Sequence, residues 1–158
     1  MRGAAYPVVD GTAHDATALS ELALRSKGYW GYDAAFLEAC RDELTLTADQ
    51  VAATRVVRAP GGAVRGFHLL APDRAGDPDR GELLMLFVDP PAIGSGVGRV
   101  LVDDAIRHAA RLGWSALRVE SDPGAEGFYV AIGARRVGTV PSGSVPGREL
   151  PLLELPVG

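Results

Sequence analysis

Apolar residues recur along the chain at the spacings of helices and strands, and turns rich in glycine and proline separate the runs. Residues 6–9 form a short apolar run that predicts a strand, and residues from Thr12 to about Arg25 show helical spacing, with Thr12 as a candidate cap. A second helix is predicted over residues 32–44, with Asp33 able to cap it. Its expected apolar face comprises Ala35, Phe36, Ala39, Cys40 and Leu44.

Three short apolar runs follow, at residues 54–59, 63–71 and 82–88. The turn residues Pro60, Gly61 and Gly62 lie between the first two runs, which predicts an antiparallel hairpin. The third run, ELLMLFV, is almost wholly apolar, so we expect a central strand that is buried on both faces.

The rest of the chain predicts a long helix, a strand, a short helix and two closing strands. In the long helix, which Gly113 ends, an apolar stripe is formed by Val97, Leu101, Ala105 and Leu112. The solvated face carries charges that include an expected pair between Asp103 and Arg107. Residues 115–121, 134–140 and 149–157 read as strands and residues 124–133 as a helix, which gives an α/β (α+β) fold.

Three glycines, Gly94, Gly96 and Gly98, lie between the apolar run at 82–88 and the long helix. At such a position, backbone N–H groups and the helix dipole bind phosphate. The spacing fits neither the dinucleotide pattern G-x-G-x-x-G nor the nucleoside-triphosphate pattern G-x-x-x-x-G-K-S/T. The loop is therefore either an anion site of another kind or a tight turn.

Composition limits the class of protein. With 158 residues, 47% of them hydrophobic and 23% charged, the chain is expected to form one soluble globular domain. A net charge of -4 argues against nucleic-acid binding, and no segment is apolar enough for a signal peptide or a membrane span. The single cysteine, Cys40, fits a reducing compartment and a buried structural thiol, so we expect a cytoplasmic protein.

Two motifs together resemble those of the GNAT superfamily of N-acetyltransferases. The stretch DPGAEGFYVAIGARRVG at residues 122–138 resembles the family pattern N-x-x-A-x-x-F-Y-x-x-x-G-F, and IGSGVG at 93–98 resembles its pyrophosphate loop. The resemblance implies a bacterial acetyltransferase domain over residues 1–158 that uses acetyl-CoA and no metal. It also implies a mixed, mostly antiparallel sheet of about seven strands, splayed between strands 4 and 5 and flanked by about four helices.

The resemblance assigns cofactor contacts residue by residue. The backbone of Phe87 and Val88 would pair with the pantetheine arm, and Tyr129 would be the general acid for the departing thiolate. The pyrophosphate would lie against Gly94, Ser95, Gly96, Val97, Gly98 and Arg99. The chain departs from the pattern where Ile93 and Ser95 replace basic or glutamine side chains. It also departs at Asp122, where an asparagine is common and which either contacts the cofactor or caps the next helix.

The base and the acceptor contacts remain open from the sequence. Glu82 lies where some family members carry a catalytic glutamate, but it also reads as a solvated residue at a strand end. His68 either titrates in the useful range or is a structural residue of an apolar strand. Trp30 and Tyr32, in a turn that covers the acceptor opening in this family, either form an apolar or cation-binding wall or seal the helices to the sheet.

The leading hypothesis is direct acetyl transfer to a primary amine of a small molecule or to an exposed amino group. A non-catalytic acyl-CoA-binding module on the same fold is the main alternative, and a protein that binds another phosphate ligand is a third. A homodimer is common in the family. The sequence does not identify the acceptor.

Overall fold

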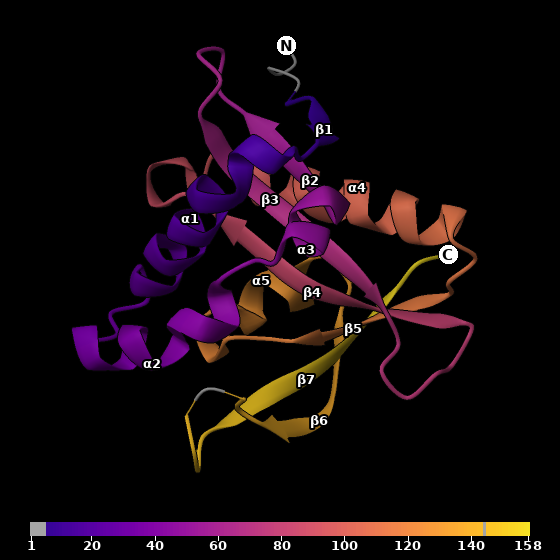
Figure 1. The fold of residues 1–158 in the computed structure, drawn as a ribbon. Helices are drawn as coiled ribbons and strands as arrows, with labels where there is room; N and C mark the ends of the chain where they lie inside the picture. Colours follow the sequence, from indigo (N-terminus) through magenta and orange to yellow (C-terminus); the bar gives the residue numbers. More distant parts are fainter. Residues whose placement is uncertain (1–5, 144) are drawn as a thin grey trace. The chain divides into compact units, whose positions relative to one another are not determined.

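The computed structural model describes residues 6–143 and 145–158, so the start of the chain, where no apolar leader is expected, lies outside the described residues at positions 1–5. Within the described ranges, seven strands form a mixed sheet with the order β1-β2-β3-β4-β5-β7-β6. The strands are β1 (Val8–Asp10), β2 (Thr54–Arg58), β3 (Val64–Pro72), β4 (Arg80–Val88), β5 (Ala116–Glu120), β6 (Arg135–Pro141) and β7 (Glu149–Pro156) (Figure 1). The helices are α1 (Ala16–Gly28), α2 (Ala34–Leu44), α3 (Ala48–Ala53), α4 (Val97–Arg111) and α5 (Glu126–Ala131).

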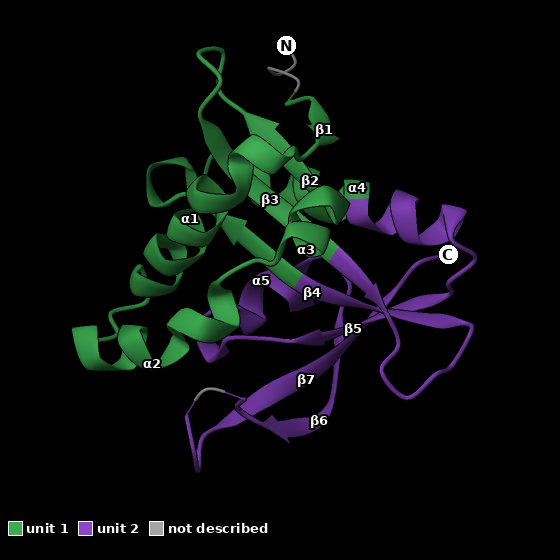
Figure 2. Cartoon of the chain, viewed as in Figure 1, with its two compact units in different colours: residues 1–69, 85–104 green, residues 70–84, 105–158 purple. Residues whose placement is uncertain are grey.

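The chain divides into two compact units (Figure 2). Unit 1 comprises the chain up to Leu69 together with Met85–Asp104, and unit 2 comprises Leu70–Leu84 with Ala105–Gly158. This α/β arrangement, with its mostly antiparallel sheet, is the expected fold class, and the described residues form five α-helices where about four were expected. No helix in the described ranges is both long and apolar enough to cross a bilayer.

The core of unit 1 has two layers. On one face of β2 and β3, buried side chains of α1, α2 and α3 pack against Val56, Phe67 and Leu69. On the other face, Val57 packs with Ala92, Val97 and Leu101 of the segment that leads into α4. A Cβ at Gly66 would lie 2.9 Å from the Leu101 side chain and 3.0 Å from that of Val97. Gly66 therefore allows α4 to approach β3 closely.

Several local expectations for unit 1 are confirmed. Asp33 caps α2 by accepting a hydrogen bond of 2.8 Å from the Phe36 N–H, and Cys40 is buried. The β2–β3 hairpin forms, with Gly62 at a φ of +98° in its turn. The apolar face expected for α2 is partly wrong, because Ala35 and Ala39 are exposed.

Helix α3 was not predicted. Its six residues are too few for a helical period to stand out. A signal was nevertheless present, since Thr47 and Gln50 have the spacing of a capping box. In the structure each accepts a hydrogen bond from the other's backbone N–H, at 3.2 Å for Thr47 Oγ1 and 2.9 Å for Gln50 Oε1.

Helix α4 carries the expected stripe except at its end. Val97, Leu101 and Ala105 are buried, but Leu112 lies beyond the last helical residue and its side chain is 50% exposed. Gly113 ends the helix at a φ of +85°, as predicted. Among the charges of the solvated face, an ion pair of 3.4 Å joins Arg99 to Asp103.

Unit 2 is built on the parallel pairing of β4 with β5, which includes Glu82 opposite Arg118, and on the antiparallel pairing of β7 with β5 and β6. Leu117 and Val119 of β5 and Leu153 and Leu155 of β7 are buried. The expectation that β4 is buried on both faces is wrong at Leu84, which is 39% exposed. The exposed Leu84 follows Glu82 by two residues and therefore lies on the same face of β4.

Candidate active site

The glycine loop of unit 1 presents unused backbone N–H groups. Gly94 and Gly96 have φ angles of +88° and +95°, which side chains rarely adopt, and a Cβ at either would meet no atom within 4 Å. The first helical hydrogen bond runs from the Val100 N–H to the Gly96 carbonyl. Within the described chain, no acceptor binds the N–H groups of Gly96, Val97 and Gly98. The loop is thus both a turn that needs glycine and an open cradle of donors.

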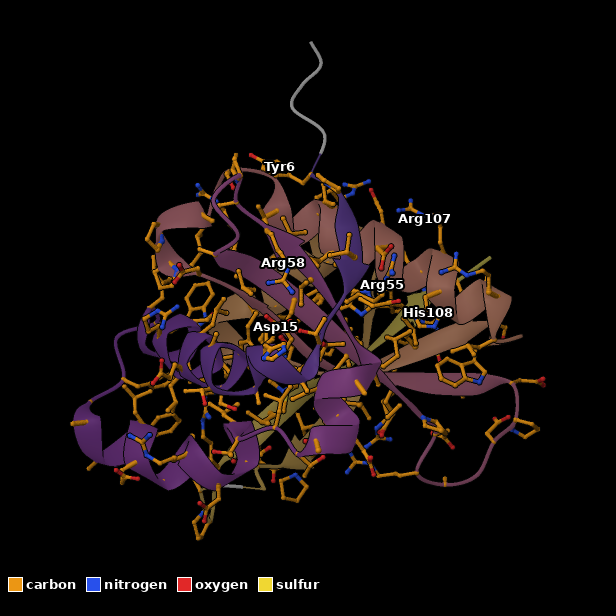
Figure 3. The ribbon with its side chains drawn as sticks, turned by 45° about the horizontal axis from the view of Figure 1, so that its top comes forward. Tyr6, Asp15, Arg55, Arg58, Arg107 and His108 are labelled. Carbon is orange, nitrogen blue, oxygen red and sulfur yellow. The ribbon has the colours of Figure 1, made fainter. Side chains whose placement is uncertain are left out.

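The carbonyl groups of the loop are occupied. Ala92 accepts hydrogen bonds from both the backbone N–H and the hydroxyl of Ser95. The hydroxyl of Tyr6, labelled in Figure 3, donates to the Ser95 carbonyl at 3.2 Å. The Ser95 carbonyl and the Gly96 N–H belong to one peptide group and point in opposite directions. Because Tyr6 binds the carbonyl, the Gly96 N–H points away from Tyr6. This contact joins residues far apart in the chain and was not predictable from sequence.

Gly96→Ala should weaken CoA binding at least about tenfold, a change of about 1.4 kcal/mol, because a methyl group would stand among the unused donors. The positive φ adds strain of about 1–2 kcal/mol, so stability should fall as well. Gly62→Ala is a matched control, since Gly62 has a φ of +98° and also has no atom within 4 Å of an added Cβ. Calorimetric titration and urea unfolding of both variants separate the two effects. Equal CoA affinity for the two variants would mean that the glycines serve only the turn.

The segment before the loop is also fixed within unit 1. Phe87 and Val88 are half-buried, and the Phe87 ring lies 5.9 Å from that of Phe67. Asp89, which follows the strand, donates its N–H to the Arg65 carbonyl at 2.8 Å and pairs with Arg25 of α1 at 3.1 Å. The end of β4 is therefore held from both β3 and α1.

The turn between α1 and α2 carries an aromatic cluster. Tyr29 and Trp30 are 51% and 41% exposed and meet edge to face at 5.1 Å. Tyr32 stacks on Phe36 at 4.0 Å, and the Lys27 ammonium lies 5.7 Å from the centre of the Tyr32 ring. The Tyr32 ring is thus placed beside a cation of the chain itself, the Lys27 ammonium.

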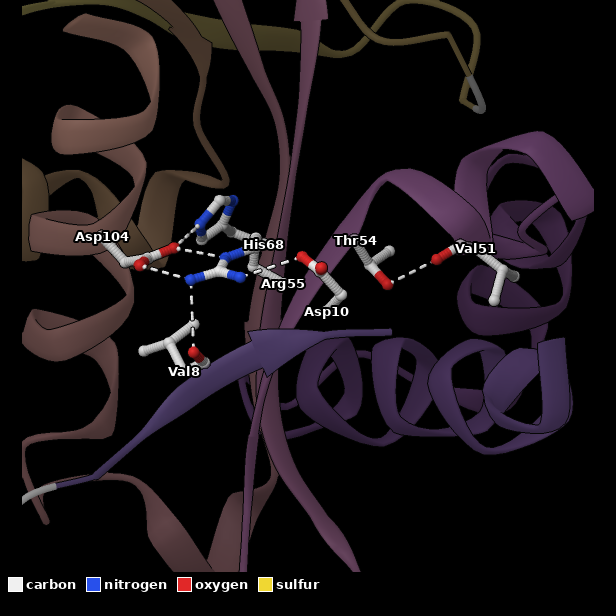
Figure 4. Close-up of polar contacts among 7 residues, drawn as sticks. All are labelled: Val8, Asp10, Val51, Thr54, Arg55, His68 and Asp104. Carbon is white, nitrogen blue, oxygen red and sulfur yellow. Dashed lines mark hydrogen bonds and ion pairs between the residues drawn. The ribbon is translucent and has the colours of Figure 1, made fainter. Parts of the chain in front are cut away.

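His68 belongs to a buried polar network under α4 (Figure 4). Its Nε2 lies 2.8 Å from Oδ2 of Asp104, and its Nδ1 is buried with no hydrogen-bond partner in the described chain. Arg55, opposite His68 on β2, donates to both oxygens of Asp104 at 3.1 and 3.2 Å and to Asp10 at 2.9 Å. The sequence analysis missed Asp104, although a carboxylate three residues after the buried Leu101 marks a polar group on the inner face of the helix.

Glu82 lies in a four-residue charged cluster of unit 2. It is buried, so the expectation of a solvated strand end is wrong. Arg74 donates from Nε to Glu82 Oε1 at 2.9 Å, and its Nη2 lies 3.1 Å from Oε2 of Glu120. Arg118, the strand partner of Glu82, lies 3.6 Å from Glu82 and 3.5 Å from Glu120. Sequence reasoning missed the two arginines, because a cross-strand contact depends on register.

In unit 2, Asp122 precedes the 3-10 turn Pro123–Ala125 that leads into α5, and Tyr129 lies within α5. Asp122 accepts a hydrogen bond of 2.9 Å from the Gly124 N–H, which confirms the capping role, and lies 3.6 Å from Arg148. Tyr129 is buried in α5, whereas Phe128 and Ile132 are half-buried. Burial raises the pKa of the Tyr129 hydroxyl. The two catalytic candidates, Glu82 and Tyr129, are not in contact among the described residues, since the charged partners of Glu82 are Arg74 and Arg118.

Comparisons with known proteins agree on one family. The sequence model of the acetyltransferase (GNAT) family matches residues 18–134. A segment of 63 residues is 44% identical to a mycothiol acetyltransferase from Propionibacterium freudenreichii subsp. shermanii and covers 39% of this chain. That segment spans only 20% of the length of the curated relative.

Solved structures share the fold. The PaiA N-acetyltransferase from Thermoplasma acidophilum, in complex with coenzyme A, superposes with a TM-score of 0.77 at 17% identity, over 97% of this chain and 99% of that one. The acetyltransferase YncA from Salmonella typhimurium, with acetyl-CoA, gives a TM-score of 0.71 at 20% identity, over 98% of this chain and 95% of that one.

Proposed function

Because the chain belongs to the GNAT acetyltransferase family, we propose that it transfers an acetyl group from acetyl-CoA to a primary amine of a small molecule or to an exposed amino group. The glycine loop is the observation that carries this proposal. Its positive φ angles, its open space and its unused N–H groups fit a pyrophosphate. Residues 94–99 would hold the diphosphate, and the backbone of Phe87 and Val88 would pair with the pantetheine arm.

Acetyl-CoA supplies a thioester, in which the amine nitrogen forms a bond to the carbonyl carbon while the carbon–sulfur bond breaks. The transfer releases one proton from the amine and requires one proton on the sulfur. Tyr129 is the proposed acid, and its raised pKa keeps the hydroxyl protonated at neutral pH. Glu82 is the proposed base, and its buried carboxylate would take the amine proton directly or through a water molecule.

The remaining candidates take supporting roles in this proposal. Asp122 caps the 3-10 turn Pro123–Ala125 that leads into α5, and Trp30 with Tyr32 forms part of the acceptor wall. We assign His68 to the scaffold, because it is fully buried and bound to Asp104. Ile93 and Ser95 bring no charge to the phosphates, and Arg99 is the cation of the loop.

CoA or acetyl-CoA should raise the melting temperature, whereas ATP and NAD should not, because the loop matches neither nucleotide pattern. A ligand that binds only the folded state adds about 2.7 kcal/mol at a hundredfold excess over its Kd. A thermal-shift screen with millimolar ligands measures this, and release of free CoA thiol in an amine panel measures catalysis. A missing shift with CoA would contradict the cofactor assignment. A CoA shift without turnover of any amine would favour the non-catalytic acyl-CoA-binding module.

A further inference from the structure

Within the described residues, the guanidinium of Arg118 on β5 makes no hydrogen bond. Its Nε is buried and has no partner within the described chain, and its contacts with Glu82 and Glu120 are ion pairs of 3.6 and 3.5 Å. A guanidinium carries five N–H donors in a planar fork that matches a carboxylate. Buried donors are nearly always bonded, and this Nε is an exception. The Arg118 side chain as a whole is 31% exposed, so its other N–H groups are open to a ligand.

The carboxylates around Arg118 are already engaged more closely by other arginines. Arg74 approaches Glu82 to 2.9 Å and Glu120 to 3.1 Å. Glu154, opposite Arg118 on β7, is bound by Arg80 at 2.7 Å and by Arg135 at 3.3 Å. The described residues therefore supply Arg118 with compensating charge but with no hydrogen-bonded acceptor.

The charges of the cluster restrict which ligand can join it. Arg74, Arg118, Glu82 and Glu120 sum to zero, so a ligand with a net charge would leave the partly buried cluster unbalanced. An ammonium group next to Glu82 together with a carboxylate on Arg118 would preserve neutrality. A zwitterion is the class of small amine that offers both groups.

On the basis of the proposed function, we infer that the acceptor is an amine that also bears a carboxylate, of the kind found in an α-amino acid. Arg118 binds the carboxylate through two N–H donors and is a specificity-determining residue. This places the amine on the side of Glu82, the proposed base, because Glu82 and Arg118 are paired in the β4–β5 register.

The test compares α-amino acids with their own carboxamides, for example leucine with leucinamide and glycine with glycinamide, as acceptors in the thiol-release assay. The carboxamide keeps the amine and the side chain but removes the negative charge. For the wild-type protein, kcat/KM of the preferred amino acid should exceed that of its carboxamide by about 10- to 100-fold.

Arg118→Gln should abolish this preference, mainly through a higher KM for the amino acid. Arg118→Lys keeps the charge and tests the fork if the glutamine variant does not fold, and it should lose most of the preference. Arg135→Gln is the matched control, since Arg135 pairs with a glutamate of the same sheet but is 75% exposed, and it should keep the preference. CoA-induced thermal shifts report whether each variant retains the cofactor site.

Equal rates for acids and amides, or a preference that survives in both Arg118 variants, would overturn the inference. Turnover of aminosugars or polyamines in place of any amino acid would overturn it as well, while acetyl transfer itself would stand. A protein that neither binds CoA nor acetylates any amine would instead refute the proposed function, and the inference with it.

Discussion

Tyr129→Phe should lower kcat by about 10²- to 10⁴-fold and leave the Kd for acetyl-CoA within a few-fold, because the change removes the proton donor but keeps the ring. Burial raises the pKa of this hydroxyl above the ordinary value of about 10, so the wild-type group stays protonated while the acceptor amine is neutral. The Tyr129 hydroxyl should therefore stay protonated below pH 10 and cause no change of activity with pH in that range. Steady-state kinetics across pH, with calorimetric CoA binding, measures both quantities.

Tyr6→Phe makes the same chemical change at the glycine loop and should act on a different constant. Its hydroxyl holds the Ser95 carbonyl, and a single hydrogen bond contributes about 0.5–1.5 kcal/mol, so the Kd for CoA should rise several-fold.

If Tyr129→Phe keeps the wild-type kcat, the thiolate leaves without Tyr129 as its acid. If Tyr129→Phe instead loses CoA affinity or stability, Tyr129 is a cofactor or core residue and the proposed mechanism is wrong.

The strands and long helices were predictable because each buries one regular face. Alternation in β5 and the stripe from Val97 to Ala105 in α4 follow directly from the periods of a strand and a helix. Exposure was harder to predict, since Leu84, Ala35 and Ala39 are apolar residues whose surroundings depend on neighbouring elements. Apolar side chains also occur often on protein surfaces, so their presence does not establish a buried face.

The candidate site was predictable where it depends on local backbone and not where it depends on register. Gly94 and Gly96 were singled out from sequence because only glycine adopts their φ angles easily. In the sequence Arg118 is one polar residue of an alternating strand. Its contact with Glu82 depends on the β4–β5 register, which the sequence does not specify. Asp104 likewise gains its role from Arg55 and His68, which approach it from two strands distant in sequence.

The Asp104 network is expected to be the most sensitive point of unit 1. Burial alone raises the pKa of Asp104, but hydrogen bonds from His68 and Arg55 outweigh it, and the net shift is downward. Because the pKa is lower in the folded than in the unfolded chain, the carboxylate stabilises fully above the unfolded value of about 3.9. Its contribution begins to fall below that unfolded value and is gone once the pH has passed the folded value, so acid should destabilise the wild-type protein.

Asp104→Asn should lower the free energy of unfolding by about 3 kcal/mol at neutral pH, since it removes one charge from a buried pair. This is the lower end of the usual range, because the Arg55 side chain is 21% exposed and keeps its bond to Asp10. Asp10→Asn removes a carboxylate from the same arginine at a side chain that is 81% exposed, and should cost less than about 1 kcal/mol. Urea unfolding between pH 7 and pH 3 measures both variants. Between pH 7 and pH 3, the free energy of unfolding should fall less in Asp104→Asn than in the wild type. If Asp104→Asn and Asp10→Asn lose the same free energy of unfolding at neutral pH, Asp104 contributes no more than a surface charge.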